Sequence, residues 1–228
     1  LIADAIPENA PELAKYLKGD ETFTDIQGHW AENVIKTLAE SDKISGVGDG
    51  KFNPDGTVTR AEFLKMAMDS LGIVGHAYRD GECLDATNDD WYCYYLQGAL
   101  DKDIIPEEMI ENCNVTKVTK TLAEATDDKK AVTTDVNVYT GKFDGDKPIT
   151  REEMAAIAVR CKNYKMRRLT DWDNERRYPI FSFKDSDEID EKYISDVVKA
   201  YNLNYIDGME DGRFAPKENL TRAQAAVV

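Results

Sequence analysis

A short motif that begins a helix occurs three times in this chain and constrains its fold more than any other feature. Each copy is an apolar residue followed by Thr-Arg, then Ala or Glu, then Glu or Gln. A threonine followed three residues later by Glu or Gln forms a capping box, in which both side chains satisfy backbone N–H groups at a helix start. Repetition of this unit predicts an array of helical repeats. The predicted structural capping pairs are Thr59 with Glu62, Thr150 with Glu153 and Thr221 with Gln224.

The composition limits the partners that such an array can have. The 228 residues carry a formal net charge of −15, so nucleic acid is an unfavourable partner. No apolar stretch approaches the roughly 20 residues that a membrane-spanning helix needs. The chain starts at Leu1 without a basic and apolar leader pattern, and it stops at Val228 inside the helix that Thr221 is expected to cap. We therefore expect a soluble, trimmed segment of a longer protein.

Two segments share one order of motifs. Repeat one, predicted over residues 22–73, has Phe-x-Asp, a helix with apolar residues at helical spacing, a Gly-Asp-Gly-x-Phe-x-Pro loop and the Thr-Arg helix. Repeat three, predicted over residues 183–228, follows the same order and is truncated at its C-terminal end. A similar number of residues separates the opening aspartate from the motif arginine in both, namely Asp25 from Arg60 and Asp185 from Arg222. This agreement indicates one supersecondary unit used repeatedly.

The middle repeat, predicted over residues 77–161, keeps both ends of the pattern but is longer. Asp80 stands for the opening aspartate and Arg151 for the motif arginine. An insertion of about residues 107–142 separates them, and two stretches rich in Val and Thr flank a polar turn within it. These stretches, 114–119 and 131–140, predict a surface β-hairpin.

Two further segments lie outside the repeats. Residues 1–21 form an N-terminal extension with a short helix candidate at 12–17, which we expect to pack against the array. Residues 162–182 form a linker rich in Lys and Arg between repeats two and three. These cations are either solvated linker charges or a local patch that attracts anions.

The cysteines and the loops give no support for a metal site. The spacings of Cys83, Cys93, Cys113 and Cys161 match no zinc pattern, so they predict either one or two disulfides or buried free thiols. The loop before Glu62 imitates the second half of an EF-hand loop. The position of the first calcium ligand, however, is Lys or Arg in all three repeats: Lys51, Lys142 and Arg213. We therefore expect no metal and no cofactor.

No catalytic motif accompanies the repeats. The chain lacks Gly-x-Ser-x-Gly, a Walker loop and His-Glu-x-x-His, and it has only two histidines. Its 44 acidic residues make close carboxylate pairs expected on a solvated surface. The sequence therefore predicts a protein that is not an enzyme.

The arginine of each motif needs a separate explanation. A cation in the first turn of a helix opposes the helix dipole and costs about 0.3 kcal/mol or more. Two compensations are open: an ion pair with the opening aspartates Asp25, Asp80 or Asp185, or an external anion held between the guanidinium and free N–H groups at the helix start. The aromatic residues that begin the first helices are likewise either core anchors or ligand platforms. They are Trp30, Trp91 and Tyr193.

The ordered set Phe-x-Asp, His-Trp-Ala, Ile-x-Gly, Gly-Asp-Gly-x-Phe-x-Pro and Thr-Arg-Ala-Glu resembles the S-layer homology (SLH) repeat. Repeat one matches almost every element, repeat three lacks His-Trp-Ala, and repeat two lacks the glycine loop. The resemblance implies a mainly α fold. Three pseudo-symmetric helix-loop-helix repeats would form a three-pronged spindle around a central helical bundle, as a monomeric pseudo-trimer.

The resemblance also implies a function. Members of this family bind anionic secondary cell-wall polysaccharide, typically through pyruvylated amino sugars, in grooves between repeats, and the motif arginine is a main contact. This implication favours the external anion as the arginines' partner. The polysaccharide-binding residues that it suggests here are Arg60, Arg151, Arg222, Asp25, Asp80, Asp185, Trp30, Trp91, Tyr193 and Gly212.

The predicted function is therefore a non-catalytic anchoring module that tethers a larger surface protein to the cell wall or S-layer of a Gram-positive-type bacterium. No nucleic acid and no membrane insertion are expected, whereas other surface proteins are possible partners. The alternative is a degenerate SLH module that acts as a structural or protein–protein interaction domain at the cell surface. In that alternative, the inserted hairpin recruits a protein.

Overall fold

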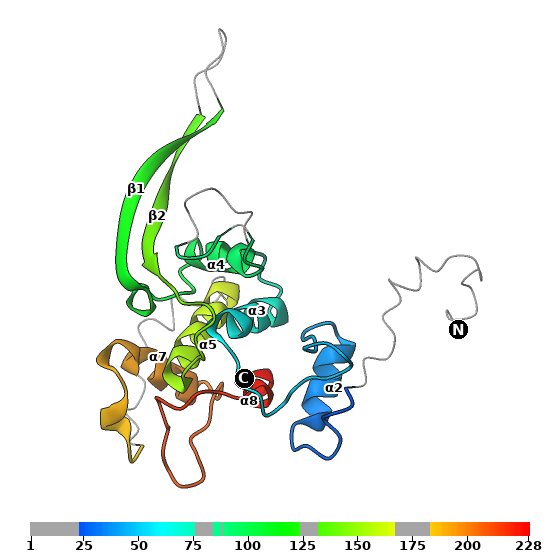
Figure 1. Cartoon of the computed structure of the whole chain (residues 1–228). Helices are drawn as coiled ribbons and strands as arrows, with labels where there is room; N and C mark the ends of the chain where they lie inside the picture. Colours follow the sequence, from blue (N-terminus) through cyan, green and yellow to red (C-terminus); the bar gives the residue numbers. More distant parts are fainter. Residues whose placement is uncertain (1–22, 76–83, 88, 124–131, 167–182) are drawn as a thin grey trace, which may run out of the picture.

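The computed structural model describes residues 23–75, 84–87, 89–123, 132–166 and 183–228 (Figure 1). These residues form six α-helices, two short 3₁₀ helices and one two-stranded antiparallel sheet, so the mainly α prediction is confirmed. The predicted extension, residues 1–21 with its helix candidate, lies outside the described residues. The elements are α2 Glu32–Glu40, α3 Arg60–Ser70, α4 Cys93–Leu100, η2 Glu107–Met109, β1 Glu111–Ala123, β2 Val132–Lys142, α5 Arg151–Met166, η3 Ser186–Glu188, α7 Glu191–Asn202 and α8 Arg222–Val227.

Among the described residues, the strongest helix contacts join different repeats. The second helix of repeat one, α3, contacts α4 of repeat two, and α5 of repeat two contacts α7 of repeat three. The second helix of repeat three, α8, contacts α2 of repeat one. Each repeat therefore completes the hydrophobic contacts of its neighbour, and the array closes on itself.

A ring of backbone hydrogen bonds lies where the three repeats meet. The apolar residues that precede the three Thr-Arg motifs donate and accept in turn. Val58 N–H donates to Leu220 O at 3.0 Å, Leu220 N–H to Ile149 O at 3.2 Å, and Ile149 N–H to Val58 O at 3.1 Å. All three residues are buried. The ring explains why each motif has an apolar residue before its threonine, because this residue lies at the centre of the array.

The hairpin predicted in the insertion of repeat two is present. Strands β1 and β2 pair antiparallel, with Val118 opposite Val136 and Thr116 opposite Val138. Figure 1 shows the two strands extending away from the helices as a long twisted ribbon. Their lower end is anchored by Tyr139, which is buried in the main hydrophobic core.

The basic linker predicted over residues 162–182 begins later than expected. Helix α5 continues to Met166, so the first residues of that segment are helical. Residues 167–182 lie outside the described residues. The repeat boundaries given above stay predictions, as does the three-pronged spindle.

Candidate functional site at the junctions between repeats

The start of each second helix is a junction with the loop of the next repeat. The capping threonines accept from the backbone N–H three residues on, and Glu62, Glu153 and Gln224 accept in return from the threonine N–H. The first two backbone N–H groups of each second helix also donate hydrogen bonds, in this case to the neighbouring repeat. Arg60 N–H donates to Lys147 O and Ala61 N–H to Gly145 O, both at 2.9 Å. Equivalent bonds join α5 to Glu218 O and Pro216 O, and α8 to Gly56 O and Pro54 O.

These bonds change the expected anion site. The sequence interpretation relied on free N–H groups at the helix start, and these N–H groups instead bind carbonyl oxygens of the neighbouring repeat. A carbonyl carries a partial negative charge and satisfies the helix terminus as an anion would. An external anion must therefore be held by side chains.

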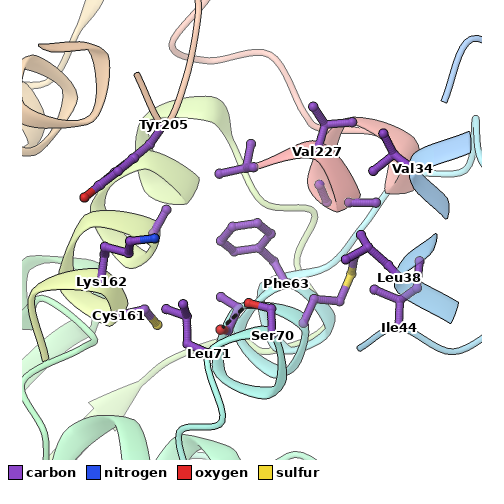
Figure 2. Close-up of a pocket in the computed structure, with 16 residues that line it drawn as sticks. Val34, Leu38, Ile44, Phe63, Ser70, Leu71, Cys161, Lys162, Tyr205 and Val227 are labelled. Atoms are coloured by element: carbon purple, nitrogen blue, oxygen red, sulfur yellow. Dashed lines mark hydrogen bonds between the residues drawn. The ribbon is translucent and has the colours of Figure 1, made fainter. Parts of the chain in front are cut away.

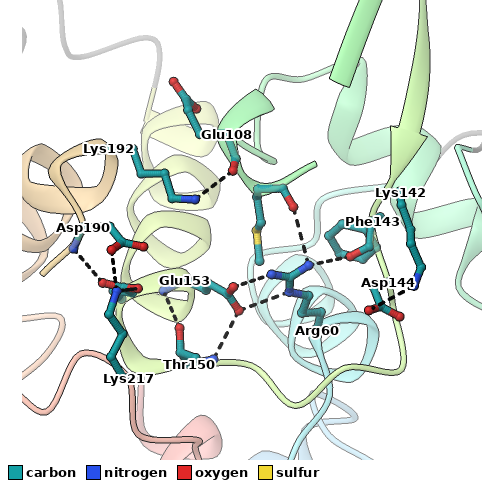
Figure 3. A network of polar contacts seen from close by, with 12 residues as sticks. Arg60, Glu108, Lys142, Phe143, Asp144, Thr150, Glu153, Asp190, Lys192 and Lys217 are labelled. Atoms are coloured by element: carbon teal, nitrogen blue, oxygen red, sulfur yellow. Dashed lines mark hydrogen bonds and ion pairs between the residues drawn. The ribbon is translucent and has the colours of Figure 1, made fainter. Parts of the chain in front are cut away.

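Arg60 is buried and lies against the loop of repeat two (Figure 3). Its Nε and Nη2 donate to both carboxylate oxygens of Glu153, a bidentate pair, and its Nη1 donates to Phe143 O at 2.7 Å. Its guanidinium also lies 6.0 Å from the centre of the Phe143 ring. Arg60 thus links α3 to both the loop and the second helix of repeat two.

Arg222 makes the equivalent contacts with repeat one. Its Nε donates to Phe52 O at 2.9 Å, Nη2 to Ser45 O at 3.0 Å and Nη1 to Glu62 Oε1 at 3.3 Å. Its guanidinium carbon lies 4.8 Å from the centre of the Phe52 ring. Burial lowers the pKa of Arg222, and the nearby carboxylates of Glu62 and Asp25 oppose this shift. At two junctions, the charge of the motif arginine is therefore compensated within the chain. The compensating carboxylate belongs to the capping box of a neighbouring repeat and not to an opening aspartate.

Arg151 differs from the other two. Its Nε donates to Phe214 O at 2.7 Å and its Nη2 to Asp207 O at 2.9 Å, with the Phe214 ring centre 5.1 Å from the guanidinium. The residue at the position of Glu153 and Glu62 in repeat three is Gln224, which carries no charge. Burial lowers the pKa of Arg151, and the charges of Glu218 and Asp185 oppose this shift.

The opening aspartates fold the loops that receive the arginines. Asp25 accepts from Phe52 N–H at 2.9 Å and Asn53 N–H at 2.8 Å, and Asp185 accepts from Phe214 N–H and Ala215 N–H, both at 2.8 Å. In repeat two this role belongs to Asp85, which accepts from Phe143 N–H at 2.7 Å and Asp144 N–H at 3.0 Å.

Asp85 corrects the sequence assignment of Asp80, which lies outside the described residues. The sequence contained a usable signal. Asp85 stands at nearly the same distance before Trp91 as Asp25 does before Trp30, and Phe143 retains the phenylalanine of the glycine loop. The insertion hid this correspondence.

The two tryptophans lie at the surface: Trp30 is 65% exposed and Trp91 is 52% exposed. Each first helix ends with a backbone bond to a carbonyl five residues earlier, from Lys43 to Leu38, Ile104 to Ala99 and Tyr205 to Ala200. Trp30, Trp91 and Lys192 lie at the same distance in sequence before these three carbonyl residues, so they occupy equivalent positions in the three repeats. Tyr193 is therefore one residue past the assigned position, and it is buried. The interpretation of the two tryptophans as core anchors is wrong.

Repeat two has an additional polar contact that sequence reasoning missed. Glu152 stands where the other motifs have alanine, and it is buried at the start of α5. Lys217 Nζ lies 2.6 Å from Glu152 Oε1 and 2.7 Å from Asp190 Oδ1, while Asp190 N–H donates to Glu152 Oε2 (Figure 3). Burial raises the pKa of Glu152, and Lys217 and Asp190 N–H oppose the rise. Glu152, the first glutamate of Thr-Arg-Glu-Glu, was the sequence signal from which this contact could have been predicted.

Gly212 has a conformational role in the loop of repeat three. Its φ is +85°, which a residue with a side chain rarely adopts, and its N–H donates to Met209 O at 2.9 Å. Its carbonyl accepts from Lys184 N–H at 3.1 Å. The glycine thus closes the turn before Phe214.

One pocket in the described part of the chain is apolar and separate from the junctions. It has a volume of about 320 Å³ and lies between α2, α3, α5 and α8 (Figure 2). Phe63, Leu38 and Leu71 line it, with Lys162 and Tyr205 at one side. Carboxylates are not among its lining residues, so it does not offer the mixed polar surface that a sugar requires.

The cysteines fall into two states among the described residues. Cys93 is disulfide-bonded, whereas Cys113 and Cys161 have free thiols. Cys161 is fully buried beside the apolar pocket, and burial raises its pKa to about 12. A thiol of this kind is a packing residue. Cys83 lies outside the described residues.

The closed array of interlocking helix-loop-helix units defines the chain as a repeat domain. A sequence model of the S-layer homology domain family matches residues 22–64 and 182–226. The resemblance noted in the sequence is therefore confirmed, and the chain belongs to the S-layer homology family.

Curated relatives are much longer than this chain. It is 33% identical over 96% of its length to an amylopullulanase of Thermoanaerobacterium thermosulfurigenes, covering 10% of that protein. It is 34% identical over 93% of its length to exoglucanase XynX of Acetivibrio thermocellus, covering 16% of that protein. A cellulosome-anchoring protein of Acetivibrio thermocellus is 37% identical over 30% of this chain, and the match covers 17% of that protein. In the described part of the chain, no helix has the length and apolar character required to cross a membrane.

Proposed function

We propose that this chain is a non-catalytic anchoring module that binds an anionic, pyruvylated cell-wall polysaccharide at the junctions between its repeats. It would tether a larger protein to the surface of a Gram-positive-type cell. Membership of the S-layer homology family and similarity to a protein named as a cellulosome anchor support this proposal. The monomeric, three-pronged arrangement is part of the same proposal.

The observation that carries the proposal is the exposure of two tryptophans at equivalent positions. Trp30 and Trp91 leave 65% and 52% of their surface in water, although an indole stabilises a fold most when it is buried. The face of a sugar ring presents C–H groups that pack on an indole, while its hydroxyls remain hydrogen-bonded at the edge. Two such surfaces at the entrances of successive first helices suit a repeating polysaccharide.

Charge at the junctions supports an anionic ligand. Each junction has a buried arginine; Arg60 and Arg222 already pair with Glu153 and Glu62, whereas Arg151 has no carboxylate partner in the described part of the chain. A pyruvate ketal presents a carboxylate, which a guanidinium binds well. The carboxylates of Asp25 and Asp185 each accept two N–H bonds, which leaves lone pairs that can accept from sugar hydroxyls. Asp85 replaces Asp80 in this role for repeat two.

The test is binding to purified wall sacculi by the whole chain. Trp30→Ala with Trp91→Ala should reduce the bound fraction at least about tenfold, because stacking on an aromatic ring contributes about 1–3 kcal/mol per site in comparable ligand contacts. Val47→Ala is the matched control, since Val47 is also exposed, at 53%, and lies in a loop. Arginine substitutions are less suitable here because they remove bonds between repeats. Unchanged binding by the double tryptophan variant, with an intact fold, contradicts the proposal.

The exposed hairpin supports the second candidate, a protein-interaction module. Strands β1 and β2 extend away from the helices, and within the described residues each strand pairs only with the other. Replacing residues 117–137 by a short Gly-Ser linker, which keeps the buried Tyr139 in place, separates the two functions. Retained binding to sacculi assigns the anchor to the junctions, whereas loss of binding with intact tryptophans favours the hairpin.

A further inference from the structure

The turn that carries Trp30 is held by a histidine on both sides of the tryptophan. Ala31 N–H donates to Nδ1 of His29 at 3.1 Å, and Trp30 lies between these two residues. His29 O accepts from Glu32 N–H, at the first residue of α2, at 3.0 Å. The two peptide groups that flank Trp30 are therefore both fixed by His29.

The bond from Ala31 defines the protonation state of the imidazole. A backbone N–H can only donate, so Nδ1 of His29 must be the nitrogen that carries no proton. The proton of the neutral ring is then on Nε2, which lies 3.3 Å from Asp55 Oδ1 and donates to it. A second proton can bind only at Nδ1. There it would face Ala31 N–H, and two donors cannot share a hydrogen bond.

Asp55 is the charged residue of the following loop that contacts the ring. It bonds to Nε2 of His29, which carries a proton in both states of the imidazole, so this bond exists before and after protonation. The side chain of Asp55 is 85% exposed, and an ion pair at such a position is screened by water. Asp55 therefore does not replace the bond that Ala31 N–H loses.

The other charged groups around the turn are bonded elsewhere. Glu32 Oε2 accepts from Gly28 N–H at 2.7 Å, and its Oε1 accepts from Lys36 Nζ at 2.6 Å. Both oxygens of Asp25 accept from backbone N–H groups of the loop. Helix α8 packs against α2, and its charged side chain, Arg222, donates to loop carbonyls and to Glu62.

The corresponding turn of repeat two has no imidazole. Asp90 precedes Trp91 as His29 precedes Trp30, and Asp90 O accepts from Cys93 N–H at 3.0 Å. The Asp90 carboxylate accepts from Thr87 N–H at 2.7 Å and from the Thr87 hydroxyl at 2.8 Å. These two bonds lower the pKa of Asp90. This turn therefore keeps its acceptor at a pH where imidazoles are protonated.

We propose that His29 is a positioning residue that makes the aromatic surface of repeat one acid-responsive, whereas the surface of repeat two is not. The inference rests on the proposed function and adds regulation to it. Imidazoles commonly titrate near pH 6.5. Above this range Nδ1 accepts from Ala31 N–H and the turn holds Trp30. Below it the imidazolium has no accepting nitrogen, so the peptide group between Trp30 and Ala31 is released.

NMR of the whole chain tests the turn without any ligand. The heteronuclear NOE reports fast motion, and it should fall for Ala31 N–H and the Trp30 indole N–H between about pH 8 and about pH 5. The Trp91 indole N–H should keep its value. His29→Asn is the matched control, because an asparagine oxygen accepts from the N–H two residues on and does not titrate. His29→Ala should show the low value at both pH values.

Binding to sacculi tests the consequence. Trp91→Ala leaves binding to Trp30, and Trp30→Ala leaves it to Trp91, so each variant controls for titration of the sacculi themselves. The bound fraction of Trp91→Ala relative to Trp30→Ala should fall about threefold or more from about pH 8 to about pH 5, as expected for the net loss of one hydrogen bond. Adding His29→Asn to Trp91→Ala should remove this fall.

The two measurements separate the inference from the proposed function. An NOE at Trp30 that changes no more than that at Trp91 overturns the acid response, and so does a fall in binding that persists with His29→Asn. Tryptophan-dependent binding with a constant ratio also overturns it, while the anchoring function stands. If the double tryptophan variant binds sacculi as well as the wild type, the proposed function fails, and NMR still decides the role of His29.

Discussion

At the scale of single residues, one aspartate in each repeat stabilises an unfavourable loop conformation. The residue after the loop phenylalanine has a left-handed backbone in all three repeats, with φ of 58° at Asn53, 57° at Asp144 and 58° at Ala215. This conformation costs an alanine about 1–2 kcal/mol. The aspartate accepts from the N–H of this residue and of the phenylalanine before it, so its carboxylate fixes the turn that each arginine contacts.

Asp185→Ala tests this role. We expect the free energy of unfolding to fall by about 2–3 kcal/mol, because two buried N–H groups lose their acceptor. Urea denaturation followed by circular dichroism measures the change. Asp187→Ala, at an exposed position two residues on, should have little effect and serves as the control. Equal losses for the two variants would show that the carboxylate of Asp185 does not hold the loop.

At the scale of elements, helices α5 and α7 are joined by a buried carboxylate. Asp196 on α7 lies 3.3 Å from Arg160 Nε on α5 and is 7% exposed. Burial raises the pKa of Asp196 from its usual value, and Arg160 only partly opposes this rise. The ionised form is therefore less favourable in the folded chain than in the unfolded chain.

This shift predicts the sign of a pH dependence. A carboxyl whose pKa is raised by folding binds more protons in the folded state, so its contribution to stability falls as pH rises through the folded pKa. Raising the pH from about 4 to about 7 should therefore destabilise the wild type relative to Asp196→Asn, as measured by the difference between their free energies of unfolding. Urea titrations at several pH values measure it, with Asp187→Asn as the exposed control. A constant difference across this range would contradict the raised pKa.

At the scale of the whole molecule, the junctions close a ring. Each second helix donates to the loop of the next repeat, and the third returns to the first. A break at one junction therefore affects all three repeats, because no repeat keeps its helix start satisfied without its neighbour. We expect one cooperative unfolding transition rather than three.

Arg60→Ala tests the ring. It should lower the free energy of unfolding by about 3–5 kcal/mol, because the buried Glu153 loses its bidentate partner. Arg151→Ala should cost less, since it leaves no paired carboxylate behind. Lys36→Ala, which removes a half-exposed pair with Glu32, is the control and should cost at most about 1 kcal/mol. A separate early transition in Arg60→Ala, with the other repeats still folded, would refute the closed ring.

The sequence by itself determined the features that depend on neighbours in the chain. The starts of α3, α5 and α8 follow from capping boxes that involve residues three positions apart, and the alternation of Val and Thr specified the hairpin of β1 and β2. Repetition of the motif was sufficient to indicate the family.

Only the tertiary structure decided the partners of the motif arginines, the role of Asp85 and the exposure of Trp30. Each depends on a residue from another repeat or from beyond an insertion. Arg222, for example, donates to Phe52 O, which is 170 positions away. Hydrogen bonds and burial depend on distance in space, and chain spacing fixes that distance only within a helix turn or a hairpin.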